Sequence, residues 1–124
     1  SPLAETNRRR LLNLAGISFI GVQALPAQLA QQRYDVLIEG IFGTGFAGRL
    51  PAEVAACCRL LNASDGLKVA LDMPTGLNGD TGDVDADVFR AELTYTFGAY
   101  KPAHLMDAGR AVCGEIVCLD IGIQ

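Results

Sequence analysis

Short apolar runs alternate along the chain with segments whose apolar residues recur at helical spacing. The apolar runs predict five strands, at 17–22, 36–38, 68–71, 93–97 and 116–119. The run at 36–38 is continuously aliphatic, which is typical of a strand covered on both faces. Helices are predicted from Ser1-Pro2 to Gly16, over 26–32, and from Pro51. In the last of these, Val54, Cys58 and Leu61 mark a buried face at i, i+4, i+7 spacing.

This alternation predicts an α/β fold. Strands separated by helices favour an open, mainly parallel sheet with helices on both faces, which makes three layers. The crossovers between parallel strands are expected to be right-handed. The 124 residues fit one domain, 1–124, without an internal linker. The segment 73–87 is rich in Gly, Asp, Asn and Thr, so we expect it to be a polar loop outside the core.

Composition excludes several classes of function. Acidic residues outnumber basic ones by 14 to 10, there is no Trp, and the one basic run, 8–10, is short, so nucleic acid is not an expected partner. No apolar run approaches the ~18–20 residues of a membrane-spanning helix, so no membrane partner is expected. The four cysteines form no C-x-x-C motif, which favours free thiols in a reduced, cytoplasmic compartment over zinc or disulfides.

Three predicted strands are followed by an acid, namely Glu39, Asp72 and Asp120. Parallel sheets bind ligands beyond the carboxyl ends of their strands, so some of these carboxylates should converge on one edge. There they could bind a cation or transfer a proton. The alternative is that each acid only marks the point where a strand emerges into water.

The loop after Glu39 contains Gly43-x-Gly45-x-x-Gly48, in which backbone N–H groups could approach a phosphate. It departs from the dinucleotide-binding fingerprint because Pro51 places the helix start after the third glycine. A flexible turn without a ligand is the alternative.

A second loop, 72–76, follows a strand directly. Its Asp72 carboxylate and Thr75 hydroxyl could both face a cation or a ribose, or the loop could be a plain turn with a capping acid. Lys101, after the strand 93–97, could pair with a substrate phosphate or a neighbouring acid, or lie exposed. His104 is the only histidine, which excludes a multi-histidine metal site.

Four segments together resemble a known family: YDVLIEGIFGTG (34–45), LDMPTGLNGDTG (71–82), TFGAYKP (96–102) and DIGI (120–123). They are similar, in order and spacing, to the NAD(P)H-hydrate epimerase family, the YjeF N-terminal domain. The resemblance covers essentially the whole chain and implies a Rossmann-like domain. It also implies an isomerase of nicotinamide-nucleotide repair, which interconverts the R and S forms of hydrated NADH and NADPH (NADHX and NADPHX).

The resemblance further implies a bound potassium ion and a partner activity. The partner is an ADP- or ATP-dependent dehydratase that consumes the S form and is often fused behind this domain; a homodimer is also compatible with the family. By position, Asp72 matches the family's catalytic, substrate-contacting acid, and Glu39 and Thr75 match potassium ligands. The family's substrate loop corresponds to Gly43, Thr44, Gly45, Phe46, Ala47, Gly48 and Arg49.

The chain departs from the family pattern in two ways. Glu39 stands where the family has Asp, which displaces the carboxylate by one methylene. A G-N-N-G-G-D-G phosphate loop is absent, so the chain is expected to be the second part of the family domain. These departures keep open an inactive relative that acts as a nucleotide-binding or protein-interaction module. An ordinary NAD-dependent dehydrogenase fits less well because of the glycine positions.

Overall fold

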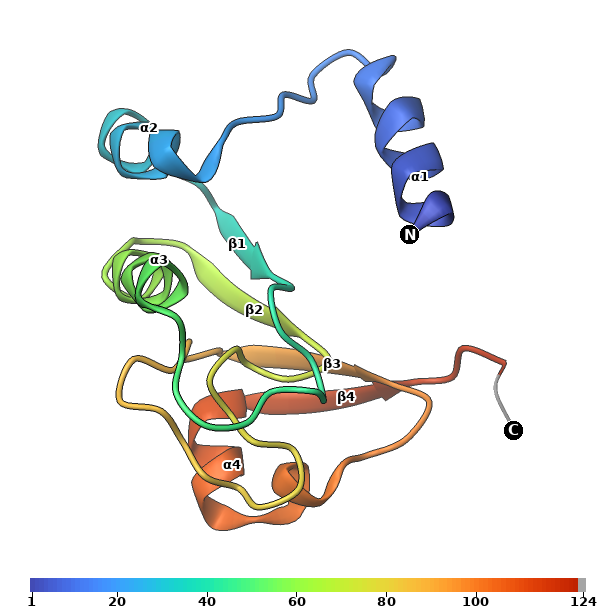
Figure 1. Ribbon diagram of the computed structural model, residues 1–124, viewed down its shortest axis with the longest axis vertical. Helices are drawn as coiled ribbons and strands as arrows, with labels where there is room; N and C mark the ends of the chain where they lie inside the picture. Colours follow the sequence, from blue (N-terminus) through green and yellow to red (C-terminus); the bar gives the residue numbers. More distant parts are fainter. Residues whose placement is uncertain (123–124) are drawn as a thin grey trace.

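A computed structural model describes residues 1–122 and shows a four-stranded, wholly parallel sheet (Figure 1). The strands are β1 (Val36–Glu39), β2 (Leu67–Leu71), β3 (Leu93–Phe97) and β4 (Glu115–Leu119). They lie side by side in chain order, and each pairs in parallel with the next. The α/β class and the open parallel sheet are therefore confirmed.

The fifth predicted strand, at 17–22, is wrong. Residues 17–21 form no regular element, and the 3-10 helix η1 (Val22–Ala24) follows them. Ile17, Phe19 and Ile20 are 43–49% exposed, so this apolar run is not part of the core. A strand exists only where a neighbour accepts its backbone hydrogen bonds, and none of the four strands pairs with this run.

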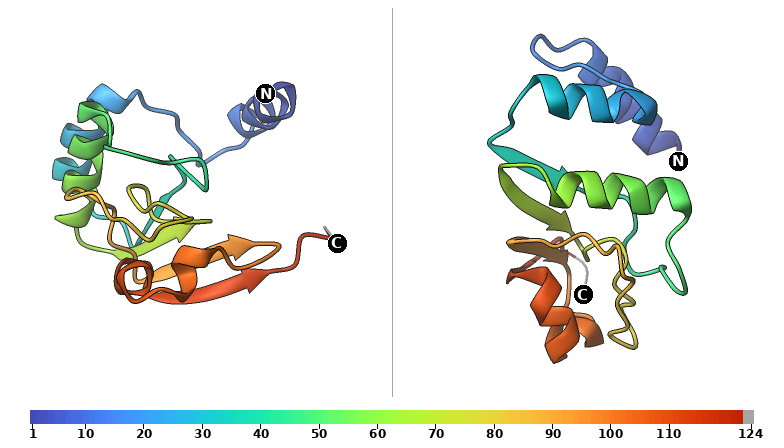
Figure 2. Two further views of the ribbon diagram at one scale, coloured as in Figure 1. Left: turned by 60° about the horizontal axis from the view of Figure 1, so that its bottom comes forward. Right: turned by 90° about the vertical axis from the view of Figure 1, so that its left-hand side faces the viewer.

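The α-helices are α1 (Pro2–Leu12), α2 (Leu25–Gln31), α3 (Ala52–Asn62) and α4 (Asp107–Cys113), and a second 3-10 helix, η2, spans Pro102–Leu105. The Ser1 hydroxyl caps α1 as predicted, accepting a hydrogen bond from the Ala4 N–H at 3.1 Å. The helix ends at Leu12 rather than near Gly16, has no buried residue, and stands away from the sheet (Figures 1 and 2). Helix α4 was not predicted; it is only seven residues long and includes Gly109.

Helices α3 and α4 cover the same face of the sheet. Ala70, Thr94 and Ile116 are neighbours in register across β2, β3 and β4, so their side chains share one face. Ala70 packs with the buried residues of α3, and Ile116 packs with those of α4. The strands are added in one direction, and right-handed crossovers then place each connecting helix on the same side.

The opposite face of the sheet is apolar and open in the part of the chain that is described. Ile38 is 63% exposed, and Val36, Leu67, Leu71 and Leu119 are 37–46% exposed. The helical layer predicted for this second face is thus not found among residues 1–122. Alternation of strands and helices does not by itself reveal on which side each helix packs, because this depends on the order of the strands in the sheet.

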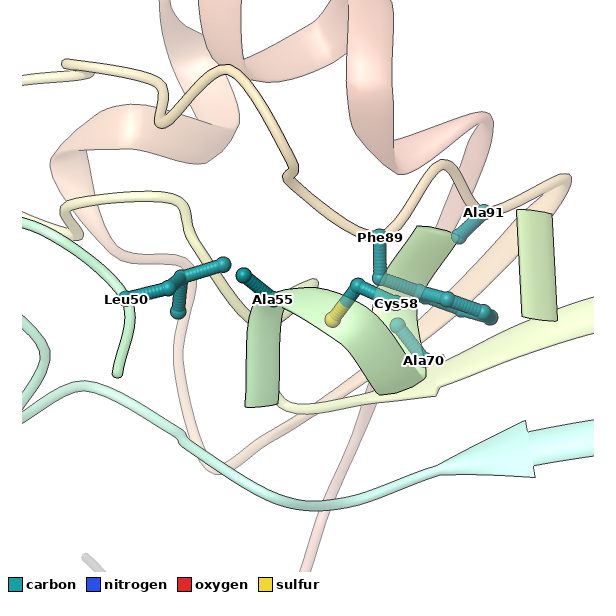
Figure 3. Packing of buried hydrophobic residues seen from close by; sticks show 6 residues of the cluster. All are labelled: Leu50, Ala55, Cys58, Ala70, Phe89 and Ala91. Atoms are coloured by element: carbon teal, nitrogen blue, oxygen red, sulfur yellow. The ribbon is translucent and has the colours of Figure 1, made fainter. Parts of the chain in front are cut away.

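Two apolar clusters lie beneath the helices. The first joins α3 to β2 and the loop before β3, through Leu50, Ala55, Cys58, Ala70, Phe89 and Ala91 (Figure 3). The second packs around α4, through Met73, Leu77, Val88, Ala103, Val112 and Cys113. The expectation of a polar loop outside the core at 73–87 is therefore wrong in part. Met73 and Leu77 are fully buried, because widely spaced apolar residues hold this polar-rich loop against the sheet.

All four cysteines are free thiols. Burial raises the pKa of Cys58 to about 12 and that of Cys113 to about 11, so both stay protonated at neutral pH and pack as small apolar side chains. Among the described residues, no helix combines the length and the apolar character that crossing a membrane requires.

We expect Phe89→Ala to lower the free energy of unfolding by about 3–5 kcal/mol, because Phe89 is fully buried in the first cluster and its removal leaves a cavity. Urea denaturation measures this loss. Leu14→Ala is the control, since Leu14 is 55% exposed and its truncation should change stability by less than about 0.5 kcal/mol. A loss of the same size in both variants would contradict this core.

Candidate functional site

The carboxyl end of β1 is tied to the loop after β2 by one buried carboxylate. Glu39 is 3% exposed and accepts hydrogen bonds from the Ile41 N–H at 2.6 Å and the Thr75 N–H at 3.0 Å. It also accepts one from the Thr75 hydroxyl. The two residues predicted as cation ligands are therefore in direct contact, although they are 36 positions apart in the chain.

The oxygen atoms around Thr75 form a small polar cluster. Its hydroxyl accepts a hydrogen bond from the Phe42 N–H at 2.9 Å and lies 3.4 Å from the Phe42 carbonyl oxygen. Carboxylate, hydroxyl and carbonyl oxygens thus meet at one point, and oxygen donors are what hard cations prefer. No buried side-chain nitrogen or oxygen of the described residues lacks a partner, so this cluster is also satisfied through hydrogen bonds alone.

Asp72 follows β2 and has an unusual backbone conformation. Its φ of +69° makes it the one described non-glycine residue in the left-handed region, which is costly for a residue with a Cβ atom. Its N–H donates to the Tyr95 carbonyl at 2.6 Å, and its own carbonyl accepts from the His104 ring at 2.9 Å. Both backbone polar groups of this strained residue are thereby held.

The Asp72 carboxylate is bound on one side only. Oδ1 accepts hydrogen bonds from Lys101 Nζ at 2.8 Å and from Thr96 Oγ1 at 3.2 Å. Oδ2 has no protein donor among the described residues and faces the glycine-rich loop, since a Cβ atom built on Gly43 would lie 3.0 Å from it. One carboxylate oxygen is therefore anchored, and the other points to the loop predicted to bind substrate.

Lys101 is held as firmly as the acid with which it pairs. Besides Asp72, its ammonium donates to Thr96 Oγ1 at 2.9 Å and to the Phe97 carbonyl at 3.0 Å. The Lys101 and Asp72 side chains are 22% and 21% exposed, so this ion pair is partly shielded from water. Of the sequence alternatives for Lys101, the structure shows pairing with a neighbouring acid.

His104 links the backbones of Asp72 and Lys101. Its side chain is 1% exposed; Nδ1 accepts from the Lys101 N–H at 2.9 Å, so Nε2 carries the hydrogen that is donated to the Asp72 carbonyl. Burial lowers the pKa of His104 below its ordinary value of 6.5, against the opposing effect of the Asp72 carbonyl. The ring is therefore neutral at physiological pH.

The two ends of the glycine-rich loop, residues 43–49, contact different parts of the structure. Gly43 lies against Asp72, while Phe46, Gly48 and Arg49 line a pocket of about 500 Å³ together with residues 78 and 83–87. Phe46 stacks on Phe42 with ring centroids 6.0 Å apart, which connects the two halves. Thr44, Gly45 and Ala47 are exposed between these two places.

The other residues that line this pocket include three acids, Asp83, Asp85 and Asp87, and Asp85 has a structural role. The Asp85 carboxylate accepts the Asp87 N–H at 2.8 Å and the Leu50 N–H at 3.1 Å, and these bonds lower the pKa of Asp85. Asp85 therefore fixes the end of the glycine-rich loop just before α3.

The structure thus brings together Glu39 with Thr75, and Asp72 with Gly43. Asp120, the third strand-end acid, follows β4 at the far edge of the sheet and caps the Gly122 N–H at 2.8 Å. Ile123, the last residue of the DIGI segment, lies outside the described residues. Sequence reasoning did not place Thr96 in the site, and it used His104 only to exclude a multi-histidine metal site. The available signal was the TFGAYKP segment, which begins with Thr96, contains Lys101 and ends two residues before His104.

Comparison with known proteins identifies a sequence family and several named relatives. The chain matches the sequence family described as YjeF-related protein N-terminus over residues 2–103. It is 43% identical over 89 residues to the bifunctional NAD(P)H-hydrate repair enzyme Nnr of Archaeoglobus fulgidus, which covers 72% of this chain and 18% of that protein. It is 37% identical over 89 residues to the NAD(P)H-hydrate epimerase of Rhodopirellula baltica, covering 72% of this chain and 36% of that protein.

A third relative extends the similarity along the chain. The bifunctional NAD(P)H-hydrate repair enzyme Nnr of Pyrobaculum aerophilum is 35% identical over 125 residues, which covers 98% of this chain and 25% of that protein. The chain therefore spans well under half the length of the curated relatives it matches, between 18% and 36% in these three.

We expect the His104 contacts to make stability depend on pH. Because its pKa is lowered in the folded state, the contribution of His104 is fully present above pH 6.5. It is lost as the pH falls below 6.5, since the unfolded chain then binds a proton that the folded chain does not. Denaturation at pH 7.5 and pH 5.5 should show a larger loss for the wild type than for His104→Gln. Equal losses in the two proteins would contradict the buried, neutral ring.

Proposed function

Because this chain belongs to the family of YjeF-related protein N-termini, we propose that it provides the epimerase site for hydrated NADH and NADPH. The observation that carries the proposal is the Asp72 carboxylate, with Oδ1 anchored by Lys101 and Oδ2 facing Gly43. A general acid–base group must have one free, directed atom within reach of the substrate, and Oδ2 is such an atom.

The chemistry requires a proton carrier of this kind. In the hydrated nicotinamide ring, one carbon bears both the hydroxyl group and the ring nitrogen. When Asp72 Oδ2 takes the hydroxyl proton, the oxygen electron pair forms a carbonyl, the carbon–nitrogen bond breaks, and Asp72 returns the proton to the nitrogen. Rotation and closure on the other face of the carbonyl reverse these steps and yield the other epimer.

The glycine-rich loop would bind the rest of the substrate. Residues 43–49 run from the acid to the pocket of about 500 Å³, so one end of a nucleotide could lie at Asp72 and the remainder along the loop. Arg49 is the basic residue that lines the pocket and would face a phosphate group. This division of the loop supports a substrate larger than the reacting ring.

Glu39 and Thr75 would hold the potassium ion that the family resemblance implies. The oxygen donors that meet there fit the chemistry of such an ion. The Thr75 hydroxyl now donates its hydrogen bond to Glu39, but it could donate to the Phe42 carbonyl oxygen, 3.4 Å away, when Glu39 binds the ion. When bound, the ion would supply positive charge at this edge of the sheet. The longer Glu39 side chain reaches Thr75 directly, which supports a tolerated replacement of Asp.

An inactive relative is the second candidate, and the structure offers less support for it. The anchored acid, the glycine loop and the Thr75 cluster are all arranged as a site would require. We propose further that the active protein works with an NAD(P)H-hydrate dehydratase, in keeping with the bifunctional names of several relatives, and that it is cytoplasmic, in keeping with its free thiols. That residues 1–124 form one domain, and that the protein is a homodimer, stay predictions.

We expect Asp72→Asn to abolish epimerisation while the fold is kept, because the amide has the shape of the carboxylate but cannot accept a proton. Full-length protein would be mixed with both epimers of NADHX, potassium and an S-specific dehydratase, and consumption of the R form followed against its spontaneous rate. Asp65→Asn is the matched control, since Asp65 lies on the surface after α3 and is paired only with Arg33. Wild-type consumption at the spontaneous rate would refute the epimerase.

We expect potassium chloride to raise the unfolding temperature of the wild type by more than sodium chloride at the same concentration. Thr75→Val should remove this difference, because it removes a proposed ligand oxygen, and Thr75→Ser should keep it. The measurement does not depend on activity. An equal response to both salts in the wild type would refute a potassium site at Glu39 and Thr75.

A further inference from the structure

The Lys101 ammonium has no donor left for a substrate. An ammonium group carries three protons, and the three acceptors around Lys101 are Asp72 Oδ1 at 2.8 Å, Thr96 Oγ1 at 2.9 Å and the Phe97 carbonyl at 3.0 Å. Pairing with a substrate phosphate, an alternative that the sequence left open, would break one of these bonds. The role of this lysine therefore has to be sought in what it does to Asp72.

A carboxylate turns readily about its terminal bond, so its two oxygens exchange places unless something distinguishes them. In Asp72 the distinction comes from Lys101 and Thr96, which both donate to Oδ1. Oδ2 receives no hydrogen bond from the described residues and lies where a Cβ atom on Gly43 would come within 3.0 Å. Lys101, which makes the shorter of these two bonds and carries the opposite charge, thus acts with Thr96 to determine which oxygen faces the glycine loop.

The pair is fixed at both of its backbones as well. The His104 ring accepts the Lys101 N–H and donates to the Asp72 carbonyl, each at 2.9 Å, so one buried side chain sets the spacing between the two residues. The strained backbone of Asp72 requires such support. The backbones of Asp72 and Lys101 are both fixed, so they should not shift when the lysine side chain is changed. The Asp72 carboxylate should move instead.

From these contacts we propose that Lys101 is a positioning residue, which binds Asp72 Oδ1 so that Oδ2 is directed at the reacting ring. The inference rests on the proposed epimerase function and adds a residue to it. Lys101 does not touch the substrate, so its loss should lower the rate of the chemical step and leave substrate binding largely intact.

The test compares three variants of the full-length protein in the epimerisation assay. Lys101→Met should lower kcat about 100-fold, the scale expected when a reacting group is misplaced by about 1 Å, with KM changed by less than about threefold. Lys101→Arg should recover to within about tenfold of the wild type, because a guanidinium group can still donate to Oδ1. Lys68→Met is the matched control: Lys68 is the other lysine of the chain, its ammonium contacts only the Gly66 carbonyl at 3.4 Å, and its variant should retain kcat.

A crystal structure of Lys101→Met beside the wild type supplies a readout that does not need activity. The Asp72 carboxylate should turn away from Thr96 in the variant, with the backbone of Asp72 unchanged. An unmoved carboxylate, an unchanged kcat, or a rise in KM alone would each overturn the positioning role. If the wild type has no epimerase activity, the proposed function fails, while the two structures still decide whether Lys101 orients Asp72.

Discussion

The turn at Asp72 is the constraint on which the rest of the structure depends. At this residue the chain leaves β2 in a left-handed conformation and enters the core, where Met73, Thr75 and Leu77 become fully buried. The turn is stable because the Tyr95 carbonyl and the His104 ring satisfy both backbone groups of Asp72. Without this support, neither the carboxylate nor Thr75 would be held at the sheet edge.

The same turn links the site to the core. The segment after it contributes Met73, Leu77 and Val88 to the cluster around α4, and Phe89 to the cluster under α3. Glu39 then joins this segment to β1 through Thr75. Polar contacts at the sheet edge and apolar contacts beneath it therefore stabilise one conformation of the loop, which is what a preorganised acid–base group requires.

The chain exposes more surface than its size requires. Its accessible area is 7968 Å², against ~6,400 Å² expected for a compact monomer of this mass. Two features contribute to this additional accessible area: helix α1, which has no buried residue and stands away from the sheet, and the open apolar face of the sheet. The site lies apart from both, on the carboxyl edge and under the loops of the covered face.

The sequence by itself determined the α/β class, the four strands and the acids at their ends, because apolar runs and strand-end polar residues are local signals. It also determined which loops carry Gly43, Asp72 and Thr75. Only the tertiary structure decided that residues 17–22 find no partner strand, that the loop after Asp72 is buried, and that the helices share one face. It alone paired Lys101 and His104 with Asp72, since contacts between residues about 30 positions apart depend on strand order and on the turn that β2 takes at its end.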